Sequence, residues 1–268
     1  MAKTILVTGA TDGIGLATAE ELIDKGNIVL LHGRSATKSK YVVSKFNDKK
    51  NRKAIPVWGD LSKMHDVMHI GQQILSMSLQ VDVLINNAGI YRKQRVITVD
   101  GFEETMAVNH FAVHLLTNDL INKKIMSKDG RIVTVSSMAH QGISIDLNNL
   151  DFNLNFSGFN AYATSKLANI LFTQCLAQKL SRTKLTANAL HPGVISTKLL
   201  HTGFSVSGDS VKSGAKTPVY LAISKNVAQI TGKYFISCVQ KPASRNATNK
   251  KTATDLWNIS NKRLKQFL

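Results

Sequence analysis

The stretch TILVTGATDGIG, residues 4–15, decides the fold of this chain. Its first residues form an apolar run with β-branched side chains, which is typical of a buried strand. Glycines follow at positions 9, 13 and 15. They allow a tight turn and a close approach of the backbone to a ligand, and a helix that begins there presents free N–H groups and a positive dipole. The stretch therefore predicts a strand, a phosphate-binding loop and a helix, with an ordinary turn as the alternative to the phosphate loop.

Outward from this stretch, short apolar runs alternate with longer segments of helical period. The predicted strands are residues 4–8, 28–32, 54–58, 81–86, 131–136, 184–190 and 233–236. The predicted helices are residues 13–25, 36–48, 62–79, 101–126, 160–181 and 211–225. Such alternation indicates a parallel sheet with helices on both faces. We expect an α/β fold of the Rossmann type, a doubly wound sheet of about seven strands. It should form a single domain over residues 1–268, with a basic tail from about 241 to 268.

The glycine loop and the ends of the next two strands are predicted to bind a dinucleotide. The loop residues are Gly9, Thr11, Asp12, Gly13, Ile14 and Gly15. At the end of the second strand, where NAD-binding folds usually place an acid, the chain has Arg34 and Ser35. A guanidinium suits the 2′-phosphate of NADP(H), which we therefore predict as the cofactor, with a solvated arginine as the alternative. After the third strand, Asp60 and Leu61 are predicted to border the adenine, unless Asp60 caps the next helix.

A tyrosine and a lysine four residues apart, Tyr162 and Lys166, lie at the start of the predicted helix 160–181. Residues at this spacing share one face of a helix, so the ammonium stands near the phenol. A neighbouring cation favours the phenolate and lowers the tyrosine pKa from about 10, which suits a general acid/base for carbonyl reduction. The spacing alone is common by chance. Ser137 strengthens the prediction, because it ends the fifth strand at the edge of the sheet where cofactor and substrate should meet.

Other residues are predicted at the same edge because they follow the ends of strands. They are Asn87, Ala88 and Gly89 after the fourth strand, and Pro192, Gly193, Val194 and Thr197 after the sixth. The turn after the fourth strand can border the cofactor or merely end the strand. Asn109 is unusual in another way, since it lies inside a predicted helix, where an amide has a poor intrinsic preference.

In this order, the motifs resemble those of the classical short-chain dehydrogenase/reductase family over about residues 1–240. The resemblance implies that Tyr162 is the general acid/base, and that Lys166 lowers its pKa and holds the nicotinamide ribose. It also implies that Ser137 orients and polarises the carbonyl oxygen, and that Asn109 fixes a backbone kink and a water that relays protons to Lys166. The turn after the sixth strand would border the nicotinamide.

The segment between Ser137 and Tyr162 holds twenty-four residues, more than in compact members of the family. This insert, with HPGV at 191–194 and GKYF at 232–235, resembles the retinol dehydrogenase-like and WW-domain oxidoreductase-like branch. Glycines and serines over about 195–215 predict a substrate lid, with an ordinary mobile loop as the alternative. The apolar side chains in that range favour a small hydrophobic carbonyl or alcohol as the substrate.

The amino-acid composition excludes several other classes of protein and of binding site. Hydrophobic residues make up 43% of the 268, which excludes wholesale disorder. Two cysteines cannot form a disulfide framework or a four-thiolate zinc site. His65 and His69, and likewise His110 and His114, stand four apart, but no third ligand is apparent, so we predict no metal site. No signal peptide or transmembrane stretch is recognisable, and we expect a cytoplasmic protein.

The anomaly is the formal charge of +17, from 34 Lys and Arg against 17 Asp and Glu. It leaves an alternative function open, a nicotinamide-binding regulatory protein that uses its basic surface to engage nucleic acid or a partner. A peripheral contact with an anionic membrane is a third interpretation. The complete set of catalytic motifs favours the enzyme, for which no nucleic acid is expected. By the family resemblance we expect a homodimer or homotetramer formed through the helices that carry Asn109 and Tyr162.

Overall fold

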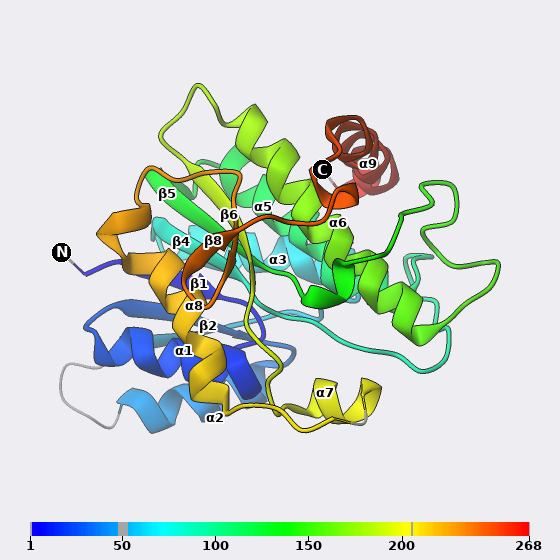
Figure 1. The fold of residues 1–268 in the computed structure, drawn as a ribbon. Coiled ribbons are helices and arrows are strands. Elements are labelled where there is room, and N and C mark those ends of the chain that lie inside the picture. The colour runs from blue at the N-terminus through cyan, green and yellow to red at the C-terminus, as the bar shows by residue number, and fades with distance from the viewer. Residues whose placement is uncertain (1, 48–52, 205, 268) are drawn as a thin grey trace.

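A sheet of eight strands forms the middle of the structure (Figure 1). The computed structural model describes residues 2–47, 53–204 and 206–267. Within these ranges the strand order is β3-β2-β1-β4-β5-β6-β7-β8; strands β1 to β7 are parallel and β8 is antiparallel to β7. The strands are β1 (Thr4–Val7), β2 (Ile28–Gly33), β3 (Lys53–Trp58), β4 (Val81–Asn86), β5 (Met126–Val135), β6 (Thr186–His191), β7 (Tyr234–Ile236) and β8 (Val239–Lys241). The predicted α/β fold with a doubly wound sheet is confirmed, and β8 is one strand more than we predicted.

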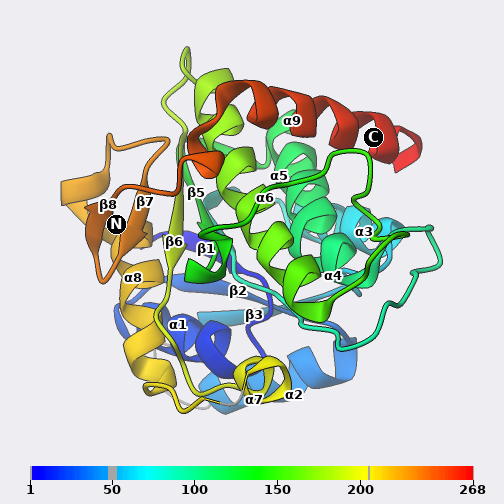
Figure 2. The ribbon, with the colours of Figure 1, turned by 45° about the vertical axis from the view of Figure 1, so that its right-hand side comes forward.

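Helices cover both faces of the sheet, as Figures 1 and 2 show from two directions. One face carries α1 (Gly13–Asp24), α2 (Ala36–Asn47) and α8 (Val211–Ile223). The other carries α3 (Met64–Ser76), α5 (Ala112–Asn122) and α6 (Gly158–Lys179). The remaining α-helices of the described part are α4 (Glu104–Met106), α7 (Lys198–Gly203) and α9 (Lys250–Leu264). No helix in the described ranges has both the length and the apolar character needed to cross a bilayer.

Strand β1 shows how the sheet is buried on both sides. Its residues Ile5, Leu6 and Val7 are fully buried. Successive side chains of a strand point to opposite faces, so Leu6 packs with α3, α5 and α6, whereas Ile5 and Val7 pack with α1, α2 and α8. Strand β1 pairs with β2 on one side and with β4 on the other, so the strand order reverses at β1. Folds of this kind bind ligands in the crevice outside the carboxyl ends of the strands at such a reversal.

The predicted helix 101–126 is interrupted in the structure. Helix α4 leads into a π-helical turn over Ala107–Phe111, α5 follows, and the last residue of the predicted range already belongs to β5. The buried carboxylate of Glu103 starts α4 by accepting hydrogen bonds from the backbone N of Thr105 at 2.9 Å and of Met106 at 2.8 Å. The π turn contains Asn109, whose amide bonds to a neighbouring segment instead of facing solvent. A local insertion of this kind leaves the apolar pattern intact, so the sequence reads as one helix.

The segment predicted as a basic tail contains a packed helix, α9. Leu256, Trp257 and Leu264 are buried, and the Trp257 ring stacks on Phe172 of α6 with the centroids 5.6 Å apart. Figure 2 shows α9 lying along the outer side of α6, away from the sheet. The buried residues of α9 recur at helical spacing. The many lysines of this segment dominate its composition and hide that pattern.

Three predicted segments reach residues that the structure does not describe; one is the basic tail 241–268, whose last residue, 268, lies outside the described ranges. Residue 48, the last of the predicted helix 36–48, and residue 205, in the predicted lid 195–215, lie outside the described ranges. The rest of the lid range contains helix α7 and the start of α8.

Candidate active site

A cavity of about 970 Å³ lies along the carboxyl ends of β1, β4, β5 and β6. Every residue predicted for cofactor binding or catalysis lines it, except Ser35 and Asn109. These residues come from segments spread over the first two hundred positions of the chain. The fold therefore brings the separate sequence motifs to one place.

The glycine loop accepts no side chain at two of its positions. Gly9 has a φ of +64°, and a Cβ there would lie 2.9 Å from Ala88 Cα. A Cβ on Gly15 would lie 2.2 Å from the carbonyl oxygen of Gly9. Gly13 begins α1, and the loop and the first turn of this helix line the cavity with bare backbone. A helix N-terminus of this form is a cradle for a diphosphate.

Hydrogen bonds between the ends of β1 and β4 hold the loop in place. Thr8 Oγ1 accepts from the backbone N of Asn87 at 3.0 Å and of Ala88 at 3.1 Å. Asn87 Nδ2 donates to the Thr8 carbonyl oxygen at 2.8 Å. Asn87, which we predicted to border the cofactor, therefore also fixes the distance between the two strand ends.

Asp12 is neutralised by a lysine from a distant segment. Its Oδ1 accepts from Gly13 N at 2.9 Å and so caps α1, while its Oδ2 lies 2.6 Å from Lys198 Nζ at the start of α7. The hydrogen bond from Lys198 lowers the pKa of Asp12, and the backbone bond from Gly13 adds to the effect. The carboxylate in the phosphate loop is thus paired with a cation of the predicted lid.

Sequence analysis missed His32, a residue of β2 that supports the glycine loop. Its buried ring accepts from Gly9 N at Nδ1 (3.2 Å), and its Nε2 lies 3.0 Å from the Gly59 carbonyl oxygen. A carbonyl can only accept, so the ring carries its proton on Nε2. Burial lowers the pKa of His32 to about 4, which keeps the ring neutral at pH 7. A histidine inside an apolar strand was the only signal in the sequence, because both partners are more than twenty residues away.

Arg34 lies at the end of β2, where it is exposed and lines the cavity. This place leaves its guanidinium free to meet an anionic group of a ligand. Ser35 does not line the cavity, and its Oγ accepts from Lys38 N at 3.4 Å at the start of α2.

Asp60 and Leu61 line the cavity after β3. Asp60 Oδ1 accepts from the backbone N of Ser62 at 3.0 Å and from its hydroxyl at 2.8 Å. Helix α3 begins at Met64, whose N donates to Asp100 Oδ2 at 2.7 Å. The alternative interpretation of Asp60 as the cap of α3 is therefore wrong, and one carboxylate oxygen of Asp60 lacks a partner in these bonds.

Tyr162 and Lys166 lie on the first two turns of α6, and Ser137 follows the end of β5. The side chains of both helix residues are buried, and Lys166 Nζ is 5.5 Å from the centroid of the Tyr162 ring. Nζ also donates to the Val135 carbonyl oxygen at 3.2 Å. The neighbouring Ser136 has a structural role, because its hydroxyl donates to the Lys166 carbonyl oxygen at 2.7 Å.

Burial dominates the pKa values of this pair. It raises the pKa of Tyr162 to about 12, and a hydrogen bond with Ser137 opposes the rise. It lowers the pKa of Lys166 to about 8. We predicted a tyrosine pKa below its usual range because of the lysine; in the protein alone the direction is the opposite, since the apolar surroundings disfavour phenolate and ammonium alike.

Asn109 holds the loop after β4 against α6. Its Oδ1 accepts from Ile90 N at 2.8 Å, and its Nδ2 donates to the Ile90 carbonyl oxygen at 3.0 Å and to Ser165 Oγ at 2.9 Å. Gly89 faces both this amide and the lysine, because a Cβ there would lie 3.2 Å from Lys166 Nζ and 3.5 Å from Asn109 Oδ1. The π turn thus places Asn109 beside the lysine without opening it to the cavity.

The segment after β6 crosses the glycine loop. Pro192, Gly193 and Val194 line the cavity, and Gly193 has a φ of +104°. Thr197 caps α7 by accepting from Leu200 N, and a Cβ on Gly13 would lie 3.5 Å from Thr197 Cγ2. The first residues of the predicted lid range therefore lie against the start of α1.

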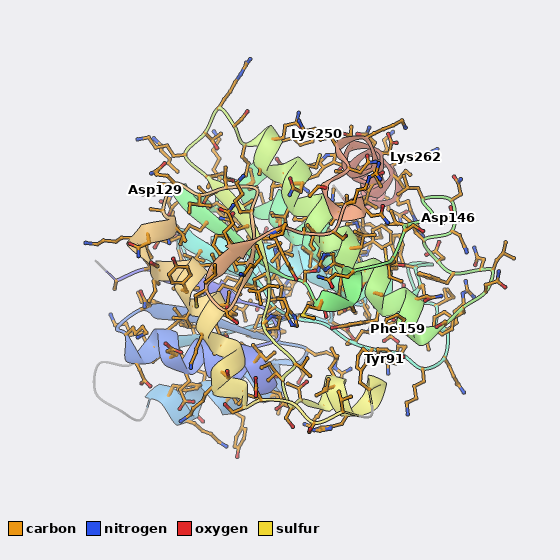
Figure 3. All side chains as sticks on the ribbon, in the orientation of Figure 1. Tyr91, Asp129, Asp146, Phe159, Lys250 and Lys262 are labelled. Carbon is orange, nitrogen blue, oxygen red and sulfur yellow. The ribbon has the colours of Figure 1, made fainter. Side chains whose placement is uncertain are left out.

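Two aromatic rings, Tyr91 and Phe204, lie next to Tyr162, and a third, Phe159, packs against Phe204. The Tyr91 centroid is 5.8 Å and the Phe204 centroid 5.9 Å from that of Tyr162, and Phe159 lies 6.2 Å from Phe204. Figure 3 shows Tyr91 and Phe159 in the same part of the molecule although they come from different elements. Tyr91 was not predicted; its ring lies against the lid, where a Cβ on Gly203 would be 2.7 Å from Cδ2. Together the rings make the surroundings of the phenol apolar.

A sequence profile of the short chain dehydrogenase family matches residues 3–205. The chain belongs to this family. Human retinol dehydrogenase 12 is 36% identical over an alignment 268 positions long, which covers 96% of this chain and 85% of that protein. The predicted resemblance to the retinol dehydrogenase-like branch is thereby confirmed.

Solved structures agree with this membership. An uncharacterized protein from Mycobacterium paratuberculosis has a TM-score of 0.81 and 31% identity, covering 98% of this chain and 93% of that one. A blue fluorescent protein from a metagenomic library, solved in complex with NADPH, has a TM-score of 0.69 and 27% identity, covering 87% of this chain and 95% of that one. This short-chain dehydrogenase is thus an oxidoreductase of a family that uses nicotinamide cofactors.

Of the paired histidines of this short-chain dehydrogenase, His110 and His114 are packed side chains, whereas His65 and His69 are exposed. His110 Nε2 lies 3.0 Å from Ser260 Oγ, and His114 Nε2 lies 2.7 Å from Asn261 Oδ1. Burial lowers the pKa of His110 to about 3 and of His114 to about 4. No group of three or more possible metal ligands occurs in the described ranges.

Proposed function

We propose that the chain is an NADP(H)-dependent oxidoreductase that interconverts a hydrophobic carbonyl compound and its alcohol, with Tyr162 as the general acid/base. One observation carries the proposal: Ser137, Tyr162 and Lys166 line the same cavity as the bare glycine loop. A cavity that holds both a diphosphate cradle and a buried acid/base group can bind a dinucleotide and a second reactant side by side.

The residues present fit a nicotinamide dinucleotide. Gly9 and Gly15 let the loop pack tightly against Ala88 and against itself, and this loop lines the cavity where the diphosphate would lie. Arg34 offers a guanidinium to the 2′-phosphate. Lys166 would hold the nicotinamide ribose, because the missing side chain of Gly89 leaves its Nζ accessible. When bound, the nicotinamide supplies the hydride for reduction and accepts it for oxidation.

Tyr162 and the side chains around it would transfer the proton that the reaction needs. During reduction the Tyr162 hydroxyl donates its proton to the carbonyl oxygen, and during oxidation it takes the proton back. Burial favours the neutral phenol, so reduction starts with the proton in place. Ser137, which shares a hydrogen bond with the Tyr162 hydroxyl, is placed to orient the same carbonyl oxygen. The ammonium of Lys166, 5.5 Å from the ring centroid, stabilises the phenolate left after the transfer.

The surroundings of the phenol favour an apolar substrate. Tyr91, Phe159 and Phe204 are in ring contact there, and Val206 at the edge of the cavity is half exposed. Binding of an apolar molecule would cover this surface. The relatives named after retinol act, by that name, on an apolar alcohol.

The test is NADPH oxidation with a panel of hydrophobic aldehydes and ketones. Removal of a general acid typically costs about 10²–10⁴-fold in rate, so Tyr162→Phe should lower kcat/KM by that factor. NADPH affinity, measured by fluorescence, should change little. No turnover by the wild type with any member of the panel, or full activity of Tyr162→Phe, would overturn the proposal.

The cofactor preference has its own test. Arg34→Asp replaces the cation beside the predicted 2′-phosphate with a charge that repels it. We expect weaker binding of NADPH and unchanged or tighter binding of NADH. Equal losses for both cofactors would argue against a contact with the 2′-phosphate.

A further inference from the structure

We infer that His140 is a positioning residue for Ser137, and that the C-terminal segment 243–267 holds the His140 ring in the orientation and tautomer that this role needs. The inference rests on the proposed function, in which Ser137 orients the carbonyl oxygen. It assigns a task to a histidine of the long insert and to a part of the chain that composition presents as a basic tail.

Ser137 begins a single helical turn that ends at His140. Its Oγ accepts from Ala139 N at 3.2 Å, and its carbonyl oxygen accepts from His140 N at 3.2 Å. The same carbonyl oxygen lies 2.6 Å from Nδ1 of the His140 ring. The peptide group of the serine is therefore held from both the backbone and the side chain of His140.

The tautomer of His140 follows from its second partner. The backbone N of Ser244 donates to Nε2 at 3.2 Å, and a backbone N–H cannot accept. Nε2 is therefore unprotonated, so Nδ1 carries the proton and donates it to the Ser137 carbonyl oxygen. The ring is fully buried and packs edge-on against Tyr234, with the centroids 5.2 Å apart. Burial also lowers the pKa of His140, which keeps the ring neutral.

Further bonds fix the C-terminal segment to the same insert. Asn246 Nδ2 donates to the Ile143 carbonyl oxygen at 2.8 Å. The guanidinium of Arg263 bonds both carboxylate oxygens of Asp151, at 2.9 and 2.7 Å. The insert is thus held at His140, at Ile143 and at Asp151 by one segment, which itself packs on α6 through Trp257. The contact of Ser244 with His140 belongs to this larger interface.

The consequence for the reaction is geometric. Ser137 is useful only if its hydroxyl points at the carbonyl oxygen and at Tyr162, and small displacements of such groups lower rates strongly. Loss of the His140 ring would leave the Ser137 carbonyl oxygen with the backbone bond from His140 N but without the ring bond, and would leave the Ser244 N–H without its acceptor. A histidine that merely filled the core would lower stability, whereas a positioning residue acts on the rate through Ser137.

A double-mutant cycle separates these two roles. Misplacement of a reacting group by about 1 Å can cost about 10²-fold in rate, so we expect His140→Leu to lower kcat by about tenfold or more with the KM for NADPH unchanged. In the Ser137→Ala background, His140→Leu should cause no further loss. His140→Gln should recover most of kcat, because its amide can donate to Ser137 and accept from Ser244. An equal loss in both backgrounds would overturn the inference.

His114→Leu is the matched control. His114 is also fully buried and also bonds the C-terminal segment, through Asn261, but it does not touch Ser137. We expect it to lower the midpoint of thermal unfolding about as much as His140→Leu, with kcat at 25 °C within about twofold of the wild type. If it lowers kcat as much as His140→Leu does, the effect is one of stability and the inference fails.

Nitrogen NMR of histidine-labelled protein tests the geometry without turnover. We expect the His140 ring at pH 7 to carry its proton on Nδ1. A proton on Nε2, or a charged ring, would overturn the inference even in an active enzyme. If the wild type turns over no carbonyl compound, the proposed function fails, and the observed tautomer still supports or rejects the hydrogen bond to Ser137.

Discussion

At the scale of single residues, the site is built by placing groups where their charged forms are unfavourable. Tyr162 and Lys166 are both buried, and burial moves their pKa values towards the neutral species, to about 12 and about 8. An isolated pair of this kind costs stability, so its presence indicates a function. The lysine makes this cost measurable, because its charge can be removed without changing its length greatly.

We predict that Lys166→Met makes the protein more stable and inactive. Folding lowers the lysine pKa from 10.5 to about 8, so below about pH 8 the folded protein holds a desolvated ammonium. That penalty is relieved as the pH rises from about 8 towards 10.5. The Val135 carbonyl oxygen keeps a hydrogen bond from Asn169 Nδ2 at 3.3 Å. The free energy of unfolding at pH 7 should rise by about 1–3 kcal/mol.

Urea unfolding at pH 7 and pH 10 checks this prediction. The gain should shrink at pH 10, because the folded wild type is then neutral at Lys166. Lys216→Met, at an exposed position of α8, should change neither the stability nor kcat. A loss of stability at pH 7 would contradict the assignment of Lys166 as a buried, costly charge.

The residues that sequence analysis found and missed differ in the range of their contacts. Tyr162 and Lys166 are one helical turn apart, and the glycines of the first loop are contiguous, so local spacing reveals them. His32 bonds backbone groups of two other segments, and His140 bonds Ser244, which is 104 residues away. No local pattern encodes such partners, and only the folded chain identifies these histidines as supports of the site.

At the scale of elements, helix α7 and helix α1 meet through one ion pair. Lys198 Nζ and Asp12 Oδ2 are 2.6 Å apart, although both side chains are largely exposed. The carboxylate stands at the start of the helix that would bind the diphosphate. Without the lysine it would repel the phosphate groups of a bound cofactor, so we expect the ion pair to support cofactor binding.

We predict that Lys198→Ala weakens NADPH binding, because it leaves the Asp12 carboxylate unpaired beside the cofactor. Exposed ion pairs contribute little, so the loss should be about twofold to fivefold at low salt and smaller at high salt. Adding Asp12→Asn to this variant should restore most of the affinity. Fluorescence titration with NADPH measures the effect, with Lys216→Ala as the control for loss of a surface charge. Unchanged affinity of Lys198→Ala would refute the coupling.

Helices and strands were predictable from the sequence where a single pattern of apolar residues runs over the whole element. The apolar runs at 4–8, 28–32 and 81–86 match β1, β2 and β4 to within a residue or two at each end. The prediction of one continuous helix over residues 101–126 was wrong, because a π turn interrupts the helix. In this turn Asn109 bonds Ile90, and the turn leaves the spacing of the apolar residues unchanged. Strand β8 failed for another reason, since its three residues are exposed and pair only at the edge of the sheet.

At the scale of the whole molecule, the basic charge is spread over folded structure. Lys250 and Lys262, labelled in Figure 3, are exposed residues of α9. Arg263 of the same helix has a structural task, because it binds Asp151 and lies 4.6 Å from the Phe102 ring centroid. Removal of residues 241–268 would therefore damage the core, and it cannot serve to test nucleic-acid or membrane binding. Those two roles, like a cytoplasmic location, stay predictions.

Helix α9 also bears on assembly. We expected a homodimer or homotetramer through the helices that carry Asn109 and Tyr162, and the chain now offers a reason for a monomer. Trp257 stacks on Phe172 of α6 and contacts His114 of α5, with centroids 5.6 and 4.6 Å apart. The C-terminal helix thus packs on α5 and α6, the helices through which we expected the copies to associate.

We predict a monomer of 29.3 kDa in light scattering coupled to size-exclusion chromatography at micromolar concentration. The reason is that α9 already covers the apolar surface of α6, so association through that face would have to displace the helix. Trp257→Ala should lower the free energy of unfolding by about 3–5 kcal/mol, since it empties a packed site. A mass of two or four chains for the wild type would contradict this prediction, and it would mean that another surface joins the copies. A dimer that appears only in Trp257→Ala would show that α9 is what keeps the copies apart.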